Sequence, residues 1–139
     1  MGQSFFSTKV CGIGEHALDF ANERMVIFFN KKVQKELSDY SILIDDLEGE
    51  VNVEVGDFII FADSKYKITA IGEVAIKNLR ELGHCVVKFD GKTNAELPGN
   101  IHVENKEMPE IEKGMEIKFL KEDWHGFNDS ICWKLYGSI

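Results

Sequence analysis

The sequence predicts an all-β domain, a small barrel-like or sandwich domain, that carries one or two short helices. Two observations support this fold class. Short runs rich in β-branched and aromatic residues recur along the chain, and turn-forming residues such as glycine, asparagine and aspartate separate them. Helical spacing of apolar residues, by contrast, is found in only two stretches. The chain has 139 residues, which is enough for the hydrophobic core of one domain.

The short runs are predicted to form strands. The strand segments are residues 4–10, 25–29, 41–44, 51–55, 58–61, 65–70, 85–89, 100–103 and 116–120. Segment 25–29 is a continuous apolar run, whereas segment 51–55 alternates apolar and polar residues with period two. Short strands at such regular spacing favour a small barrel or a sandwich.

The two helical stretches differ in strength. They cover residues 15–22 and residues 75–82. The first is long enough for only one or two weak turns. In the second, Ile76, Leu79 and Leu82 fall on one face, and Gly83 stands at the usual C-cap position.

A faint internal repeat links residues 53–61 with residues 111–119. Both segments share the frame apolar-Glu-x-Gly-x-x-Ile-x-Phe. Glycine tolerates a positive φ, so this frame predicts a strand that is entered through a tight glycine turn. Such turns are common in small barrels, and the repeat does not require a duplication.

The charge balance opposes binding to nucleic acid. Sixteen basic and twenty-four acidic side chains give a net charge of −8, which phosphates would repel. No apolar run approaches the roughly 18 residues that cross a bilayer, and residues 1–6 lack the pattern of a signal peptide. We therefore expect a cytoplasmic protein without membrane insertion.

No cofactor and no metal is predicted. Residues 12–17 (Gly-Ile-Gly-Glu-His-Ala) fit a dinucleotide-binding fingerprint, but the βαβ unit that this fingerprint needs does not follow. Residues 45–50 are acidic but lack the spacing of a calcium loop, so a solvated hairpin loop is expected there. Cys11, Cys85 and Cys132 form neither a disulfide framework nor a CxxC site.

The setting of His84 makes it the candidate site residue. It follows the predicted C-cap of a helix, where the carbonyl end of the helix dipole favours an imidazolium cation. Two roles fit this position: a structural histidine that bonds the unpaired helix carbonyls, or a reactive or docking imidazole. The other histidines carry less information, since His16 and His125 lie in polar, loop-like segments. Alternation places His102 on the strand face opposite its two aliphatic neighbours.

One long block of residues resembles a known family. It comprises residues 78–84 (Asn-Leu-Arg-Glu-Leu-Gly-His), 89–91 (Phe-Asp-Gly) and 95–103 (Ala-Glu-Leu-Pro-Gly-Asn-Ile-His-Val). The block is similar to the glucitol/sorbitol-specific IIA component of the bacterial sugar phosphotransferase system. Weaker agreement at residues 36–40 and 68–72 extends the resemblance over roughly residues 8–120. We therefore expect a IIA-like β-barrel domain over residues 1–120 and an aromatic C-terminal extension over residues 121–139.

The resemblance implies a small, β-rich cytoplasmic phosphocarrier. In this family a histidine takes a phosphoryl group from phospho-HPr and passes it to a cysteine of the sorbitol-type IIB component, which works with IIC. Such a histidine must be exposed, with one ring nitrogen free to attack and the other held by a hydrogen bond.

The sequence departs from the family at the phosphoryl acceptor. In the family this histidine lies forty residues before the histidine of the Gly-His pair and four after a tyrosine. Counting from His84 and from Tyr40 arrives both times at Ile44, which cannot carry a phosphoryl group. Two hypotheses follow. Either another imidazole is used, with His84 the best placed, or the protein keeps the fold and binds a partner or ligand without phosphotransfer.

Overall fold

Strands make up most of the regular structure. The computed structural model describes residues 5–49 and 51–121. Within them the strands are β1 (Phe5–Ile13), β2 (Met25–Asn30), β3 (Ile42–Ile44), β4 (Glu48–Gly49), β5 (Phe58–Phe61), β6 (Ser64–Ile71), β7 (Cys85–Lys88), β8 (Asn100–Val103) and β9 (Glu116–Leu120). The helices are the 3-10 helix η1 (Ala17–Glu23) and the α-helices α1 (Lys35–Ser38) and α2 (Ala75–Leu82). The predicted all-β class with few short helices is confirmed.

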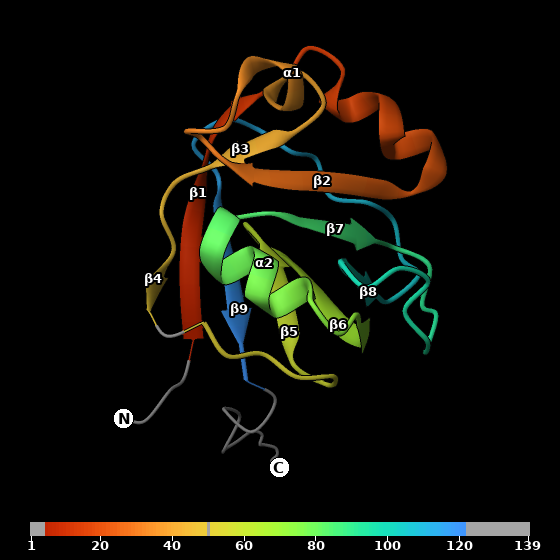
Figure 1. Ribbon diagram of the computed structural model, residues 1–139. Coiled ribbons are helices and arrows are strands. Elements are labelled where there is room, and N and C mark those ends of the chain that lie inside the picture. The colour runs from red at the N-terminus through yellow and green to blue at the C-terminus, as the bar shows by residue number, and fades with distance from the viewer. Residues whose placement is uncertain (1–4, 50, 122–139) are drawn as a thin grey trace.

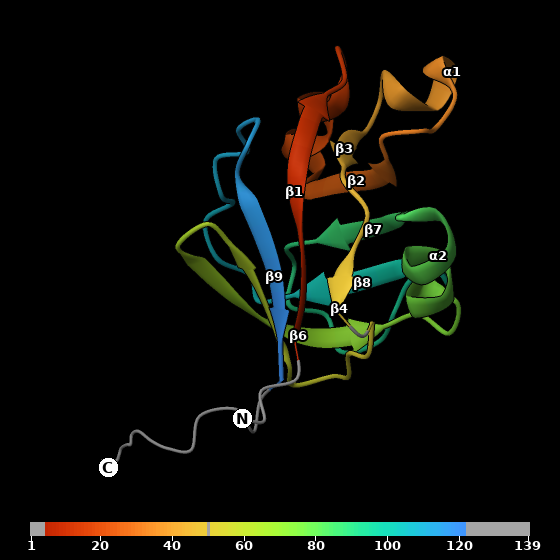
Figure 2. The same cartoon turned by 90° about the vertical axis from the view of Figure 1, so that its left-hand side faces the viewer.

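The sheet closes on itself into a barrel (Figures 1 and 2). The strand order is β3-β2-β7-β8-β6-β5-β9-β1, and β1 pairs with β3 to complete the ring of eight strands. The short β4 pairs with β1 as well. Pairs β2–β3 and β7–β8 are parallel, and the other pairs are antiparallel. Closure removes the exposed strand edges that an open sheet of this size would present.

Inward-facing side chains fill the barrel. Every second residue of β5, β6 and β7 is buried, as the pleat of a strand requires. Aromatic rings form part of the centre: Phe61 lies 5.8 Å from Phe89 and 5.7 Å from Tyr66, measured between ring centroids. The Tyr66 hydroxyl donates a hydrogen bond to the Glu107 carbonyl oxygen, so its polar end is satisfied.

The repeated glycine frame forms two equivalent turns. Gly56 and Gly114 have φ of 100° and 91°. The amide of Gly56 donates to the Ile68 carbonyl, and the amide of Gly114 donates to the Val10 carbonyl. The strands that follow these turns, β5 and β9, pair with each other antiparallel. The prediction of a strand entered through a glycine turn is therefore confirmed in both copies.

The predicted strand over residues 51–55 is wrong. These residues form no strand, and β4 lies just before them instead. The cause is the turn before β5, where the Asp57 carboxylate accepts the Glu54 amide at 2.8 Å and the Asp57 amide donates to the Glu54 carbonyl. Val53 is buried there without a ladder partner. The period-two pattern thus reflects burial beside a turn rather than pairing.

The prediction for α2 is confirmed in both bounds and cap. Gly83 has a φ of 64°, and its amide donates to the Leu79 carbonyl at 3.0 Å. Leu79 is buried on the barrel, whereas Leu82 is 51% exposed although it was expected on the apolar face. The first helical stretch forms the 3-10 helix η1, and the sequence patterns did not predict α1.

None of the helices among residues 5–49 and 51–121 is long and apolar enough to cross a membrane. The aromatic residues of the predicted extension, beyond Lys121, lie outside the described residues.

Candidate functional site

Ile44, the position at which the residue count placed the family's acceptor, lies in the core of this protein. Ile44 is 2% exposed. It is the last residue of β3 and pairs with Val10 on β1 and with Asn30 on β2. The nearby Ser41 is also buried, and its hydroxyl donates to the Leu37 carbonyl at 2.7 Å. Neither side chain is exposed as a phosphoryl acceptor must be.

The two carboxylates after Ile44 are held by neighbouring residues. Asp45 forms an ion pair with Lys31 at 2.9 Å, and the hydrogen bond from Lys31 lowers the pKa of Asp45 below its ordinary value. Asp46 accepts a hydrogen bond from the Asn30 side chain at 2.9 Å. Their negative charges face the solvent beside the family's acceptor position.

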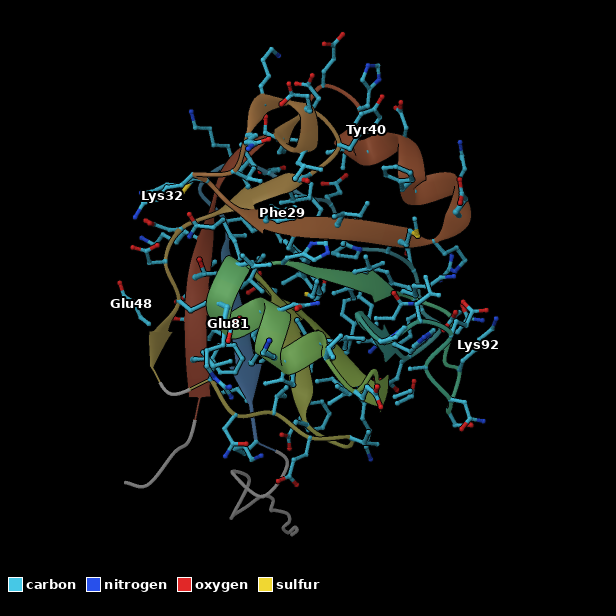
Figure 3. The ribbon with its side chains drawn as sticks, in the orientation of Figure 1. Phe29, Lys32, Tyr40, Glu48, Glu81 and Lys92 are labelled. Atoms are coloured by element: carbon cyan, nitrogen blue, oxygen red, sulfur yellow. The ribbon has the colours of Figure 1, made fainter. Side chains whose placement is uncertain are left out.

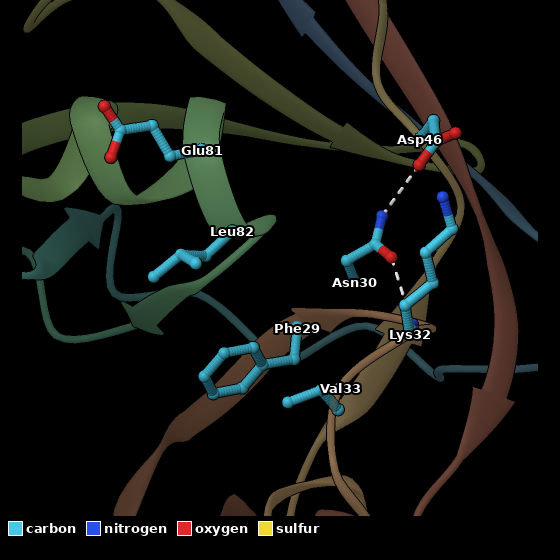
Figure 4. A pocket seen from close by; sticks show the side chains of 7 residues that line it. All are labelled: Phe29, Asn30, Lys32, Val33, Asp46, Glu81 and Leu82. Atoms are coloured by element: carbon cyan, nitrogen blue, oxygen red, sulfur yellow. Dashed lines mark hydrogen bonds between the residues drawn. The ribbon is translucent and has the colours of Figure 1, made fainter.

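A hollow of about 330 Å³ lies between the end of β2 and the last turn of α2. It is lined by Phe29, Asn30, Lys32, Val33, Asp46, Glu81 and Leu82 (Figure 4). Phe29 lies on β2 and Glu81 on α2, on the two sides of the gap between these elements (Figure 3). A second hollow of about 370 Å³ shares the side formed by Asp46, Glu81 and Leu82.

His84 packs against Phe29, one of the residues that line this hollow. Its Nδ1 lies 3.1 Å from the Phe28 carbonyl oxygen, and its ring stacks on Phe29 with 4.2 Å between centroids. A carbonyl oxygen can only accept, so Nδ1 carries the proton and the lone pair lies on Nε2. The ring therefore bonds a strand carbonyl rather than the helix carbonyls expected for a capping histidine. Its backbone amide alone takes part in the cap, donating to the Asn78 carbonyl.

Gly83 brings the end of α2, and with it His84, against β2. A Cβ on Gly83 would lie 2.9 Å from the backbone nitrogen of Asn30, so only glycine lets the end of α2 approach β2 this closely. Asn30 is the β2 partner of Ile44, and Phe28, which holds the His84 ring, lies two residues before it. His84 and Ile44, which are forty residues apart in the chain, thus both contact β2, His84 at Phe28 and Phe29 and Ile44 at Asn30.

His102 is a structural histidine. It is fully buried, with Nδ1 2.9 Å from an Asp90 carboxylate oxygen, and its Nε2 accepts the Glu96 amide at 3.2 Å. As expected, His102 lies on the face of β8 opposite Ile101 and Val103. That face is nevertheless buried as well. The loop of residues 89–99 covers that outer side, so Ile101 and Val103 are buried inward and His102 is buried outward.

The setting of His16 is more ordered than its polar, loop-like sequence surroundings indicated. Its side chain is 46% exposed, and its Nδ1 lies 3.1 Å from an Asp19 carboxylate oxygen. The ring also stacks on Tyr40, with 5.4 Å between centroids. The spacing of three residues between a histidine and an aspartate at a helix start was the available signal. His125 lies outside the described residues.

No group of three or more histidine, cysteine, aspartate or glutamate residues in the described part of the chain is arranged to hold a metal ion. Cys85 is fully buried, and burial raises the pKa of its thiol to about 12. A thiol that stays protonated is a poor nucleophile. The Cys85 thiol is therefore not suited to act as a nucleophile at this site.

Comparison with known proteins agrees with this fold. Residues 5–118 match the family model of the PTS system glucitol/sorbitol-specific IIA component. The glucitol/sorbitol-specific EIIA components of Escherichia coli K12 and Shigella flexneri are each 33% identical to the chain over 114 residues, which is 82% of this chain and 93% of each relative. The crystal structure of a PTS system IIA component from Enterococcus faecalis V583 superposes with a TM-score of 0.73 at 26% identity, covering 82% of this chain and 98% of that one. The chain therefore belongs to the family of glucitol/sorbitol-specific IIA components of the sugar phosphotransferase system.

Proposed function

We propose that this protein carries a phosphoryl group in the cytoplasm from phospho-HPr to a sorbitol-type IIB component, and that His84 is the acceptor. Membership of the IIA family implies interaction with other components of the phosphotransferase system. The observation that carries the choice of His84 is its geometry. One ring nitrogen is bonded to the Phe28 carbonyl, so Nε2 is the nitrogen left for attack, and the ring stacks on Phe29, which lines the hollow.

The proposed transfer needs no proton movement at His84. The Nε2 lone pair attacks phosphorus, an N–P bond forms, and the N–P bond of the donor breaks with its electron pair returning to the donor imidazole. The proton on Nδ1 stays bonded to the Phe28 carbonyl, which supports the positive charge that develops on the ring. Stacking on Phe29 keeps the ring in this orientation.

The charges around the hollow restrict which partner can dock. Phosphoryl transfer depends on positioning and on stabilising the charge of the phosphoryl oxygens. Lys32 supplies one cation to the lining, but Asp46 and Glu81 oppose an anion. Further positive charge would come from the docked partner, and the acidic lining favours a basic surface on that partner.

Site-resolved phosphorylation tests the proposal. The protein is incubated with phosphoenolpyruvate, enzyme I and HPr, then digested with trypsin at mildly alkaline pH because phosphohistidine is acid-labile. Cleavage after lysine and arginine places the four histidines on four different peptides, residues 10–24, 81–88, 93–106 and 122–134. We expect label on peptide 81–88 and none on peptide 93–106, since both ring nitrogens of His102 are bonded beneath the loop of residues 89–99.

His84→Gln is the matched variant. A glutamine amide can still donate to the Phe28 carbonyl but cannot hold a phosphoryl group, so the fold should be kept while the label on peptide 81–88 is lost. Label on another peptide with none on 81–88 would refute the assignment of His84 but keep the carrier function. Absence of label from all four peptides would refute phosphotransfer and leave a binding role on the IIA fold. The lack of an acceptor would then be explained by the buried Ile44 at position 44.

A further inference from the structure

A second imidazole lies at the end of the barrel where η1 and α1 meet. His16 comes after β1, and its amide donates to the Asp39 carbonyl at 2.8 Å. This bond and the bond from the Gly14 amide to the Ser41 carbonyl tie the segment to the chain between α1 and β3. In both views η1 and α1 lie on one side of β2 and α2 lies on the other (Figures 1 and 2). His16 is therefore on a different surface from the hollow beside His84.

The His16 ring is held in one orientation but remains accessible. Its Nδ1 lies 3.1 Å from the Asp19 carboxylate, and the Tyr40 ring stacks on it at an interplanar angle of 25°. Since a carboxylate accepts, the proton lies on Nδ1 and the lone pair on Nε2. No bond from the described residues occupies Nε2. Of the three described histidines, His16 is the one whose side chain is nearly half exposed.

Exposed apolar side chains belong to the same two helices. Tyr40 lies between them (Figure 3) and is 49% exposed, and its ring also contacts Phe20 of η1. Leu18 of η1 and Leu37 of α1 are each 47% exposed. A protein that docks by apolar contacts here would have an oriented imidazole within the contact area.

We propose that His16 is a second phosphoryl acceptor, which takes the group at Nε2 from a protein N-phosphohistidine. The proposal rests on the carrier function proposed above, because that function supplies the donor. The N–P bond to His16 forms as the donor's N–P bond breaks, and the electron pair returns to the donor imidazole. Nδ1 keeps its proton, so the Asp19 carboxylate faces the positive charge that develops on the ring. Asp19 is a positioning residue in this scheme and does not touch the phosphoryl group.

The tryptic digest described above also tests this inference, with HPr, enzyme I and phosphoenolpyruvate as the probe. We expect label on peptide 10–24, retained in His84→Gln and lost in His16→Gln. Asp19→Asn keeps a hydrogen-bond acceptor but removes the charge. The initial rate of labelling of peptide 10–24 should therefore fall by about fivefold, which is the size of effect expected when one exposed ion pair is lost. The rate on peptide 81–88 should not change.

A control variant must show that an exposed histidine without oriented neighbours is not labelled. Asn105 is exposed and lies in peptide 93–106. In Asn105→His the added imidazole tests whether any exposed histidine is labelled, and we expect that peptide to remain unlabelled. Equal labelling of peptides 93–106 and 10–24 in this variant would overturn the proposal, because exposure would then suffice.

The outcomes separate the two proposals. Label on other peptides but not on 10–24 overturns the inference for His16 and keeps the carrier function. Label on 10–24 that survives His84→Gln supports the inference. An unchanged rate in Asp19→Asn overturns the role given to the carboxylate. No label on any of the four peptides overturns both the carrier function and the inference.

Discussion

Replacing Gly83 by alanine tests how the end of α2 is held against β2. Gly83 has a φ of 64°, a conformation that costs an L-residue about 1 to 2 kcal/mol. In addition, the new Cβ would lie 2.9 Å from the Asn30 backbone nitrogen, and the backbone cannot move aside as a flexible side chain would. Overpacking of this kind costs about 1 to 3 kcal/mol. Gly83→Ala should therefore lower the free energy of unfolding by about 2 to 5 kcal/mol.

Gly91→Ala is the matched control. Gly91 has a similar φ of 69°, but its Cβ would meet Asn105 at an ordinary contact distance of 3.5 Å. Gly91→Ala should lower the free energy of unfolding only by the cost of the positive φ, about 1 to 2 kcal/mol. Urea unfolding followed by far-UV circular dichroism measures both variants, provided that each unfolds in two states. Equal losses in the two variants, within about 0.5 kcal/mol, would refute the proposed clash with Asn30.

Three further predictions concern the barrel. Partial burial raises the pKa of Asp90, but hydrogen bonds from His102 and the Lys92 amide lower it by more, so the folded value lies below the unfolded one. The stability that Asp90 adds is thus present above the unfolded pKa and lost as pH falls through the folded pKa, and urea titrations should show Asp90→Asn destabilising at pH 7 and neutral in strong acid. Cys85, with a thiol pKa of about 12, should resist iodoacetamide in the native protein at pH 8 and react after unfolding, as peptide mapping would show; rapid native alkylation would contradict its burial. Leu79→Ala should cost about 2 to 5 kcal/mol in urea unfolding because Leu79 is buried on the barrel, whereas the half-exposed Leu82→Ala should cost under about 1 kcal/mol.

Local patterns predicted most of the elements. β8 and β9 have the predicted bounds, and so does α2 with its glycine cap. These elements depend on interactions within a few residues, such as side-chain alternation, apolar helical spacing and a glycine with positive φ, and those are visible in the sequence. The prediction failed at residues 51–55, because the turn at Asp57 and the burial of Val53 depend on partners elsewhere in the fold.

The candidate site could be predicted only in part. The resemblance pointed to position 44 as the expected place of the acceptor, where this chain has isoleucine, and helix capping singled out His84. The alternation of β8 could not show that a loop covers His102, and the polar surroundings of His16 concealed an oriented, accessible ring. Both facts depend on residues that meet only after the chain has folded.

The sequence by itself thus determined the family and the all-β class, and it places isoleucine at position 44, because each of these depends only on residue identity and spacing. The tertiary structure decided that Ile44 is buried, that the His84 ring bonds β2 rather than its own helix, and that His16 is held by Asp19 and Tyr40. The physical reason is barrel closure. Strand pairing brings segments far apart in the chain into contact, and such contacts decide which ring nitrogen is bonded and which side chain meets solvent.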